Sequence, residues 1–191
     1  YRPASLGTMS WWTHRVTPMT DIQVRALTED EWDTFRTIRL AALTESPDAF
    51  VADAATEVDY DEEFWRVRLR RARRLYAVAD GEAAGVASLG QLDGAENTAE
   101  IFGLWVDPAW RGRSVAAALV RRASEEAVED GFERIAYWVS TDNGRAVAFA
   151  SSFGFRPTGR RRPMTVKGEN GDDEEEIAMV LSLVGDRGAS W

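Results

Sequence analysis

The sequence predicts a mixed α/β domain, an α+β mixed sheet with helices on both of its faces. The predicted elements follow the order β-α-α-β-β-β-α-β-α-β-β. A predicted helix joins two long apolar strands, residues 99–108 and 132–140, and such a crossover makes the two strands parallel neighbours. An Asp-Gly pair at residues 80 and 81 separates two further apolar runs, which predicts an antiparallel hairpin.

The first half of the chain predicts one strand and two helices before that hairpin. Residues 22–27 alternate apolar and polar side chains, as a half-buried strand does. Thr28 and Glu31 have the spacing of a capping box, which predicts a helix that ends before Pro47. Residues 61–74 predict a second helix with acids at its start and arginines at its end, in agreement with the helix dipole. We interpret these arginines as a solvated face, with anion binding as the alternative.

The second half predicts two more helices and a closing pair of strands. The helix at residues 114–130 carries apolar side chains every four residues, and Gly131 follows it as a predicted C-cap. Residues 143–154 predict a short helix that ends at a glycine. Residues 155–159 and 175–183 predict the two strands that close the chain, and we expect them to be antiparallel to each other.

The chain shows no internal repeat and no domain boundary after residue 21. We therefore expect a single domain over residues 21–184 and a C-terminal tail over residues 185–191. Residues 1–20 are interpreted as an N-terminal arm or a cloning remnant. The alternative is an arm that packs its Trp11 and Trp12 on the domain or on a second subunit.

Composition excludes several classes of function. A net charge of −9, from 23 Lys and Arg against 32 Asp and Glu, argues against a nucleic-acid partner. The lack of cysteine and a single histidine, His14, argue against a metal site, a cysteine nucleophile and a histidine-based triad. No apolar run is long enough to cross a membrane and no signal peptide is present, so we expect a cytoplasmic protein.

A basic turn precedes the helix at residues 114–130. Arg111, Gly112 and Arg113 lead directly into that helix, whose first N–H groups have no partner within the helix. The glycine lets the chain bend and lets a ligand approach, while the helix dipole and the two arginines supply positive charge. These features predict a phosphate-binding site, although a purely structural turn is the alternative.

With this turn, the sequence resembles the GCN5-related N-acetyltransferase (GNAT) superfamily from about residue 22 to residue 183. The acyl-CoA signature of that superfamily, Arg/Gln-x-x-Gly-x-Gly/Ala after a strand, is similar to the run from Arg111 to Ala116 that follows the Val-Asp-Pro of residues 106–108. A second motif of the superfamily is matched by Asn143, Ala146, Gly154, Phe155, Thr158 and Gly159.

The resemblance implies an N-acetyltransferase of the EC 2.3.1 class. It would transfer the acetyl group of acetyl-CoA to a primary amine by direct attack in a ternary complex. We slightly prefer a small-molecule amine over a protein lysine or N-terminus. The implied cofactor-binding residues are Leu104, Trp105 and Val106, beside the pantetheine arm, and Arg111, Gly112, Arg113, Ser114, Val115, Ala116 and Asn143. A bulge after Gly103 could splay the strand from its parallel neighbour.

Two positions depart from the superfamily pattern. Ser114 stands where a glycine is usual and narrows the approach to the backbone, but its hydroxyl could donate to a phosphate. The position that often carries a general-acid tyrosine is Ala150, so Ser151 is a weak substitute for this role, beside Ser152 or a water molecule.

Three further side chains near the expected cleft each allow two interpretations, one functional and one structural. Glu100 matches the position of a catalytic glutamate in several members, and it is either the general base or an exposed strand residue. Tyr137 and Trp138 line the cleft or belong to the core, and we favour the core.

The substrate side is less specific. An acidic run at residues 172–176 would favour a cationic acceptor beside the cleft, although a solvated loop is the simpler interpretation. The basic run at residues 159–164 pairs with those acids or with the 3′-phosphate of CoA. A homodimer is a further expectation by analogy. The competing functions are an acyl-CoA-binding module with little or no catalysis and a protein-interaction scaffold.

Overall fold

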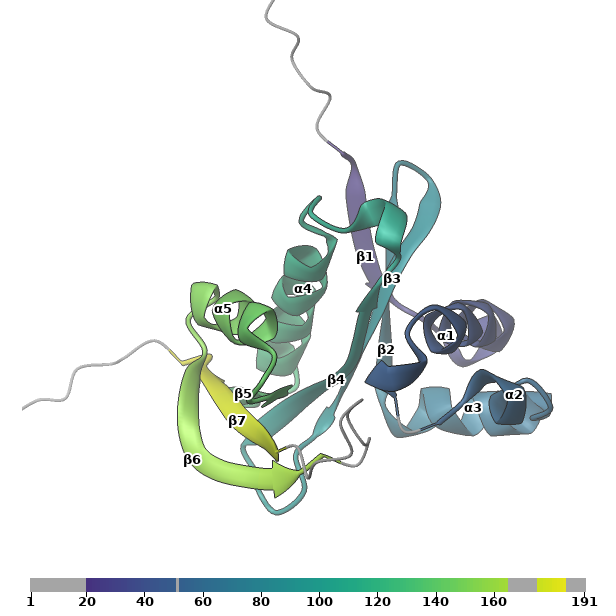
Figure 1. Ribbon diagram of the computed structural model, residues 1–191. Coiled ribbons are helices and arrows are strands. Elements are labelled where there is room, and N and C mark those ends of the chain that lie inside the picture. The colour runs from purple at the N-terminus through teal and green to yellow at the C-terminus, as the bar shows by residue number, and fades with distance from the viewer. Residues whose placement is uncertain (1–19, 51, 165–174, 185–191) are drawn as a thin grey trace, which may run out of the picture.

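The computed structural model describes residues 20–50, 52–164 and 175–184 (Figure 1). Its strands form one seven-stranded sheet in the order β1-β2-β3-β4-β5-β7-β6. Only β4 and β5 pair in parallel, which confirms the mixed sheet and the predicted crossover. The strands are β1 (Ile22–Ala26), β2 (Arg73–Ala79), β3 (Glu82–Gln91), β4 (Thr98–Val106), β5 (Arg134–Ser140), β6 (Arg156–Pro163) and β7 (Glu175–Ser182).

Helices cover both faces of this sheet, as predicted (Figure 1). One face carries α4 (Val115–Glu129) and α5 (Gly144–Ser152), and the other carries α1 (Trp32–Glu45), α2 (Ala54–Glu57) and α3 (Glu62–Arg71). Short 3-10 turns lie at Glu29–Glu31, Pro47–Ala49 and Pro108–Trp110. The predictions for residues 1–19, for the tail at residues 185–191 and for the acids at residues 172–174 lie outside the described residues.

Three element boundaries differ from the sequence prediction, one of them in the last pair of strands, where β6 extends to Pro163 beyond the predicted end at residue 159. The capping box of Thr28 and Glu31 is present, but it caps a 3-10 turn that leads into α1. The helix predicted over residues 61–74 ends at Arg71, because Ala72 is extended and Arg73 already pairs with β3. The arginines expected on one helix face are therefore divided between α3 and β2. Strand pairing overrides the helical propensity of this arginine-rich run.

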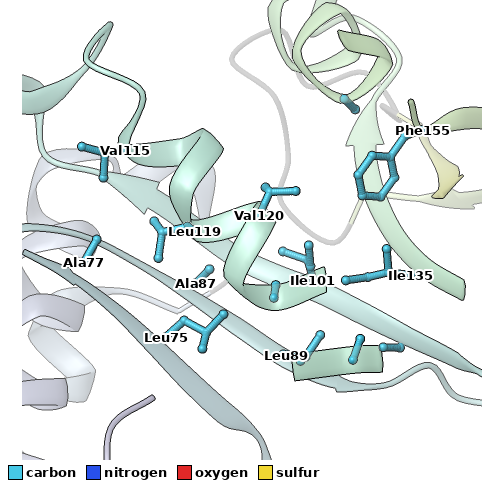
Figure 2. Close-up of a cluster of buried hydrophobic side chains, with 14 of the residues drawn as sticks. Leu75, Ala77, Ala87, Leu89, Ile101, Val115, Leu119, Val120, Ile135 and Phe155 are labelled. Carbon is cyan, nitrogen blue, oxygen red and sulfur yellow. The ribbon is translucent and has the colours of Figure 1, made fainter. Parts of the chain in front are cut away.

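The main core fills the space between the sheet and α4 (Figure 2). Leu75, Leu89 and Ile101 from three adjacent strands meet Val115 and Leu119 of the helix, and all five are at most 3% exposed. Small side chains in β2 and β3 let the helix lie close to the strands. A Cβ atom added to Gly85 would lie 2.7 Å from the carbonyl oxygen of Trp105 and 3.2 Å from a methyl of Leu119. The crossover helix is thus fixed on the sheet by tight packing.

A second, aromatic core lies between the opposite face of the sheet and helices α1 and α3. Phe35 and Trp65 meet there edge to face with ring centres 5.8 Å apart, and Trp105 of β4 joins the same cluster. Trp65 is fully buried, and its indole N–H donates to the carbonyl of Tyr60 at 3.3 Å. Aromatic side chains that bury their rings against one another hold α1 and α3 to this face.

Strand β4 separates from β5 halfway along its length. It pairs with β3 as far as Val106, whereas its pairing with β5 stops at Ile101 opposite Tyr137. In β3, Val86 lies opposite Trp105 of β4 and Ser88 lies opposite Phe102. One residue separates the pair in β3 and two residues separate the pair in β4, so β4 contains one extra residue there. Gly103, with φ +59°, lies in this bulge, in a backbone conformation that favours glycine. The predicted bulge is confirmed, and the last part of β4 faces a gap instead of a neighbouring strand.

Candidate functional site

The gap between β4 and β5 is a cleft of about 480 Å³. It is lined by the consecutive β4 residues 100–106, by Tyr137 to Ser140 of β5 and by Asn143. A second hollow of about 390 Å³ lies at the start of α4, and Val106 and Arg111 line both spaces. The structure thus brings Leu104, Trp105 and Val106 to the same channel as the basic turn.

The turn before α4 presents a row of free amides. The first backbone bond of the helix runs from the Ala118 N–H to the carbonyl of Ser114 at 3.0 Å. Within the described part of the chain, the N–H groups of residues 112–117 donate to no protein acceptor. A Cβ atom added to Gly112, whose φ is +75°, would have no heavy atom within 4 Å, so the space in front of the turn is open. Free amides at a helix start are suited to bind a phosphate.

Ser114 is the N-cap of α4, but its side chain makes no capping hydrogen bond. Its φ is +68° and its ψ +11°, which is left-handed backbone and not the extended conformation of an ordinary N-cap. This conformation explains why glycine is usual at this position: any side chain there is strained by about 1 kcal/mol or more. Ser114 adopts this backbone without help from its side chain, and it lines the hollow together with Gly112 and residues 115–117.

The two arginines of the turn make different contacts. Arg111 donates through Nε to the carbonyl of Val106 at 3.0 Å and through Nη2 to Glu45 at 2.7 Å. Glu45 also accepts from the Trp105 indole N–H at 3.0 Å, so it connects α1, β4 and the turn. Hydrogen bonds from Ser46, Trp105 and Arg111 lower the pKa of Glu45 to about 2. Arg113 stacks instead over the ring of Trp110, 5.1 Å from its centre.

Glu100 lies at the far end of the cleft. Its side chain is 18% exposed, and burial raises its pKa. Arg162 opposes this effect from 3.8 Å, while Asp93 and Glu176 add to it. Arg162 itself binds Glu176 at 2.7 Å and stacks over Trp138 at 4.2 Å. A half-buried carboxylate with a raised pKa and one loose ion pair is suited to accept a proton.

The structure does not bring Ser151 to the cleft. Ala150 is 1% exposed in the core, and Ser151, next to it on α5, is exposed and lines neither hollow. Ser152 does line the hollow at α4, but its hydroxyl donates to the carbonyl of Phe149 at 2.6 Å. Three residues with hydroxyl groups line the cleft, Ser46, Tyr137 and Ser140, and the pKa of Tyr137 is raised by burial and by Glu176.

Of the two side chains favoured for the core, Tyr137 does pack against the main core, whereas Trp138 belongs to neither core cluster. Tyr137 packs against Phe155 with ring centres 6.5 Å apart, yet both side chains also line the cleft. The buried indole nitrogen of Trp138 has no hydrogen-bond partner among the described residues. The alternative interpretation, that both residues line the cleft, therefore also holds, because the loss of the parallel neighbour after Tyr137 exposes the end of β5.

The remaining predicted residues lie at the rim of the cleft. Asn143 caps α5, since its Oδ1 accepts from the Ala146 N–H at 3.0 Å, and it also lines the cleft. Arg161 binds Glu175 at 3.0 Å and Arg162 binds Glu176, so these arginines of the basic run pair with acids of the neighbouring strand. Among the residues that the structure describes, no group of three acidic or histidine side chains could hold a metal ion, and no helix could span a membrane.

The comparisons with known proteins agree with this geometry. The sequence model of the acetyltransferase (GNAT) family matches residues 25–155. The chain is 39% identical over 57 residues to an uncharacterised N-acetyltransferase of Methanocaldococcus jannaschii, covering 30% of this chain and 25% of that protein. It is 36% identical over 78 residues to the mycothiol acetyltransferase of Beutenbergia cavernae, covering 41% of this chain and 26% of that protein. The chain therefore spans about a quarter of the length of each of these relatives.

Among solved structures, one from Salmonella typhimurium, assigned as an acetyltransferase and solved with its cofactor acetyl-CoA, has the same fold. Its TM-score is 0.65 at 21% identity, over 88% of this chain and 96% of that one. The family model covers the segment from within β1 to just beyond the end of α5. The free amides before α4, the bulge in β4 and the family match lead to one conclusion: this chain belongs to the acetyltransferase (GNAT) family.

Proposed function

We propose that this protein transfers the acetyl group of acetyl-CoA to a primary amine. One observation carries the proposal: the gap that opens between β4 and β5 continues into the free amides at the start of α4. A long, flexible ligand with amides at one end and a diphosphate at the other is complementary to this channel. The acetyl-CoA present in the related Salmonella structure supports the choice of ligand.

The residues of the channel fit the two parts of the coenzyme. The diphosphate would accept hydrogen bonds from the N–H groups of residues 113–116, next to Arg111 and the open space at Gly112. The pantetheine amides would pair with the edge of β4 at Leu104, Trp105 and Val106, which has lost its β5 neighbour. Asn143 would border the same arm from the start of α5.

The chemistry is a direct transfer between the two substrates. A neutral amine attacks the thioester carbonyl, so an N–C bond forms, the C–S bond breaks and the thiolate leaves. Glu100 accepts the proton that the amine must lose, directly or through water. No acetylated thiol is formed on the protein, because the chain has no cysteine. A thiol pKa near 8.5 makes the thiolate a good leaving group, so the demand for a general acid is small.

Tyr137 lines the cleft and Ser151 does not, so Tyr137 is the better candidate to supply the remaining proton. We expect Tyr137→Phe to lower kcat by roughly 10-fold, below the usual range for general acid–base catalysis because the thiolate leaves easily. Ser151→Ala is the matched control and should leave kcat unchanged, since Ser151 lies outside the cleft. A loss of kcat in Ser151→Ala alone, measured by release of CoA thiol, would return the role to the serine.

Calorimetry with CoA and release of thiol from acetyl-CoA over a panel of amines test the function. We expect binding to CoA, turnover with at least one amine and a sharp loss of turnover in Glu100→Gln. Tight binding without turnover across the panel would favour an acyl-CoA-binding module, which Ser114 and the buried Ala150 make a second candidate. Absence of both binding and turnover would reject both functions. We also propose that the acceptor is a small molecule and that residues 21–184 form a single domain. A homodimer is a further part of the proposal, and light scattering tests it.

A further inference from the structure

A third cavity, of about 280 Å³, lies between helices α1 and α3 and strands β3 and β4. Phe50, Phe102 and Gly103 line both this cavity and the cleft, so the two spaces meet at the bulge of β4. We name it the arginine cavity, because its lining includes Arg39, Arg68, Arg71 and Arg74. These are mainly the side chains that the sequence presented as a solvated helix face.

Arg74 is held rigidly at the inner wall of the arginine cavity. It is 8% exposed, and its guanidinium carbon lies 5.1 Å from the ring centre of Phe35 and 5.3 Å from that of Phe102. Its Nη1 donates to the hydroxyl of Ser88, and its Nη2 donates to the carbonyl of Arg68 at 3.3 Å. Its Nε is buried and has no hydrogen-bond partner among the described residues. A buried donor that lacks a partner is costly.

Positive charge in the arginine cavity exceeds the negative charge around it. The buried carboxylate of Glu57 binds Arg39 at 3.2 Å and Arg68 at 3.1 Å. Neither Arg71 nor Arg74 forms an ion pair with any carboxylate in the described ranges. Burial, then the charges of Arg68 and Arg39, lower the pKa of Arg74 to about 10, so it is still charged at neutral pH. A buried cation of this kind is normally compensated by an anion.

We propose that the arginine cavity binds a carboxylate of the acceptor, so that the preferred substrate is an amine that also carries a carboxylate, as an amino acid does. This inference rests on the proposed function and names the class of acceptor. A planar carboxylate matches the fork of a guanidinium, which binds it through two parallel hydrogen bonds. Arg71 is exposed at the edge of the cavity and completes the recognition of the anion.

The position of Glu100 agrees with an acceptor that has two charged ends. Glu100 and Phe102 alternate with Ile101 on β4, so both point away from the α4 core, and their Cα atoms are separated by about 7 Å along the strand. An amine beside Glu100 and Glu176 would meet acidic groups, while the carboxylate of the same molecule would lie among arginines. A polyamine or another acceptor with two cationic ends would instead bring positive charge to this cavity.

Matched acceptor pairs test the inference. Nα-acetyl-lysine and its carboxamide present the same side-chain amine and differ in the carboxylate, and β-alanine with its amide forms a shorter pair. We expect kcat/KM to be about 10- to 100-fold higher for the acid in the better pair, mostly through KM, as for the loss of charge-assisted hydrogen bonds. Equal turnover of acid and amide in every pair would overturn the inference and leave the proposed function intact.

Variants locate the effect. Arg71→Gln, at an exposed position, should reduce the preference for the acid about 10-fold and leave the amide unchanged. Arg70→Gln is the matched control, because Arg70 is the adjacent helix residue and binds Glu29 and Glu63 outside the cavity. Arg74→Lys should abolish the preference, provided that circular dichroism shows a folded protein. A preference that persists in both Arg71→Gln and Arg74→Lys would overturn the proposal.

A binding measurement distinguishes a failure of the proposed anion site from a failure of the proposed acetyl transfer. N-acetylglycine, which has a carboxylate but no free amine, should raise the Tm of the wild type, whereas N-acetylglycinamide should not. The shift should be reduced in Arg71→Gln and kept in Arg70→Gln. No thiol release and no CoA binding, together with this shift, would reject the proposed function while the anion site stands. Turnover without any difference between the two probes would reject the anion site.

Discussion

The two faces of the sheet use different side chains for different tasks. On the α4 face, aliphatic and small residues pack closely, and the start of the helix lines the hollow with its amides free. On the α1 and α3 face, aromatic rings alternate with arginines and enclose a polar cavity. A uniform apolar contact fixes a helix in one position, whereas a polar cavity is specific for what it binds. In the proposed reaction, the coenzyme would bind at the end of β4 next to α4, and the carboxylate of the acceptor would bind on the α1 and α3 side of the same strand.

The largest effect on stability is expected on the arginine-rich face. Glu57→Gln removes the buried carboxylate that holds Arg39 and Arg68, which leaves two partly buried cations without their partner. We expect a loss of about 3–5 kcal/mol in the free energy of unfolding, measured with urea. Glu63→Gln, which breaks an exposed pair with Arg70, should cost less than about 1 kcal/mol. Similar losses of unfolding free energy in Glu57→Gln and Glu63→Gln would contradict the distinction between the buried ion pairs of Glu57 and the exposed ion pair of Glu63.

A comparable change on the opposite face tests the packing of the crossover helix. Leu119 is fully buried between α4 and the strands, and Leu119→Ala should cost about 3 kcal/mol through the cavity that it leaves. Because the free amides at the start of α4 are proposed to bind the diphosphate, the affinity for CoA should fall as the helix loosens. Calorimetry and urea unfolding measure both quantities. An unchanged affinity in a clearly destabilised variant would mean that CoA binding does not depend on the packing of α4 against the sheet.

The pH profile of the reaction tests Glu100. Its pKa is raised, so it gains its proton at a higher pH than an ordinary glutamate, and the activity that needs the carboxylate falls below that pH. The amine must also lose a proton, so log(kcat/KM) should rise with a slope of two below the pKa of Glu100 and a slope of one above it. Glu100→Gln should lower kcat by about 10²-fold and show a slope of one throughout.

Arg162→Gln sharpens this experiment, because Arg162 is the cation that lowers the pKa of Glu100. The break in the profile should move to higher pH. The sign for stability is opposite to that of an ordinary paired carboxylate: the folded protein holds this proton more tightly than the unfolded chain, so ionising Glu100 weakens folding. Glu100→Gln should therefore not lower the Tm at pH 7. A lower Tm would mean that the carboxylate has a structural role.

The smallest effect is expected at the turn itself. Ser114→Gly removes a side chain from left-handed backbone, which relieves strain, and the greater freedom of glycine in the unfolded chain offsets part of the gain. We expect a net stabilisation of up to about 1 kcal/mol and an affinity for CoA that is equal or higher. A loss of affinity would show instead that the hydroxyl of Ser114 contacts the coenzyme.

The order of elements and the glycine-containing turn before α4 were predictable because they depend on local patterns. The crossover helix, the Asp80–Gly81 hairpin and the bulge at Gly103 are each encoded in a few neighbouring residues, and the structure confirms them. The arginine cavity was not predictable. Arg74 belongs to a run that resembles a helix end, and only its pairing with Ser88 across β2 and β3 takes it into the interior. The burial of Ala150 likewise depends on how α5 lies on the sheet.

The bulge in β4 has a consequence for which side of the sheet each later residue faces. Ile101, Leu104 and Val106 all pack toward the α4 core, whereas Trp105 belongs to the aromatic core beneath α1. A regular strand cannot place Ile101 and Leu104 on one side, since odd spacings alternate. If Gly103 instead took a regular place in the strand, with no bulge, every residue that follows would change sides. Trp105 would then turn into the aliphatic core, so the bulge at Gly103 is what keeps Leu104, Trp105 and Val106 on their present sides of the sheet.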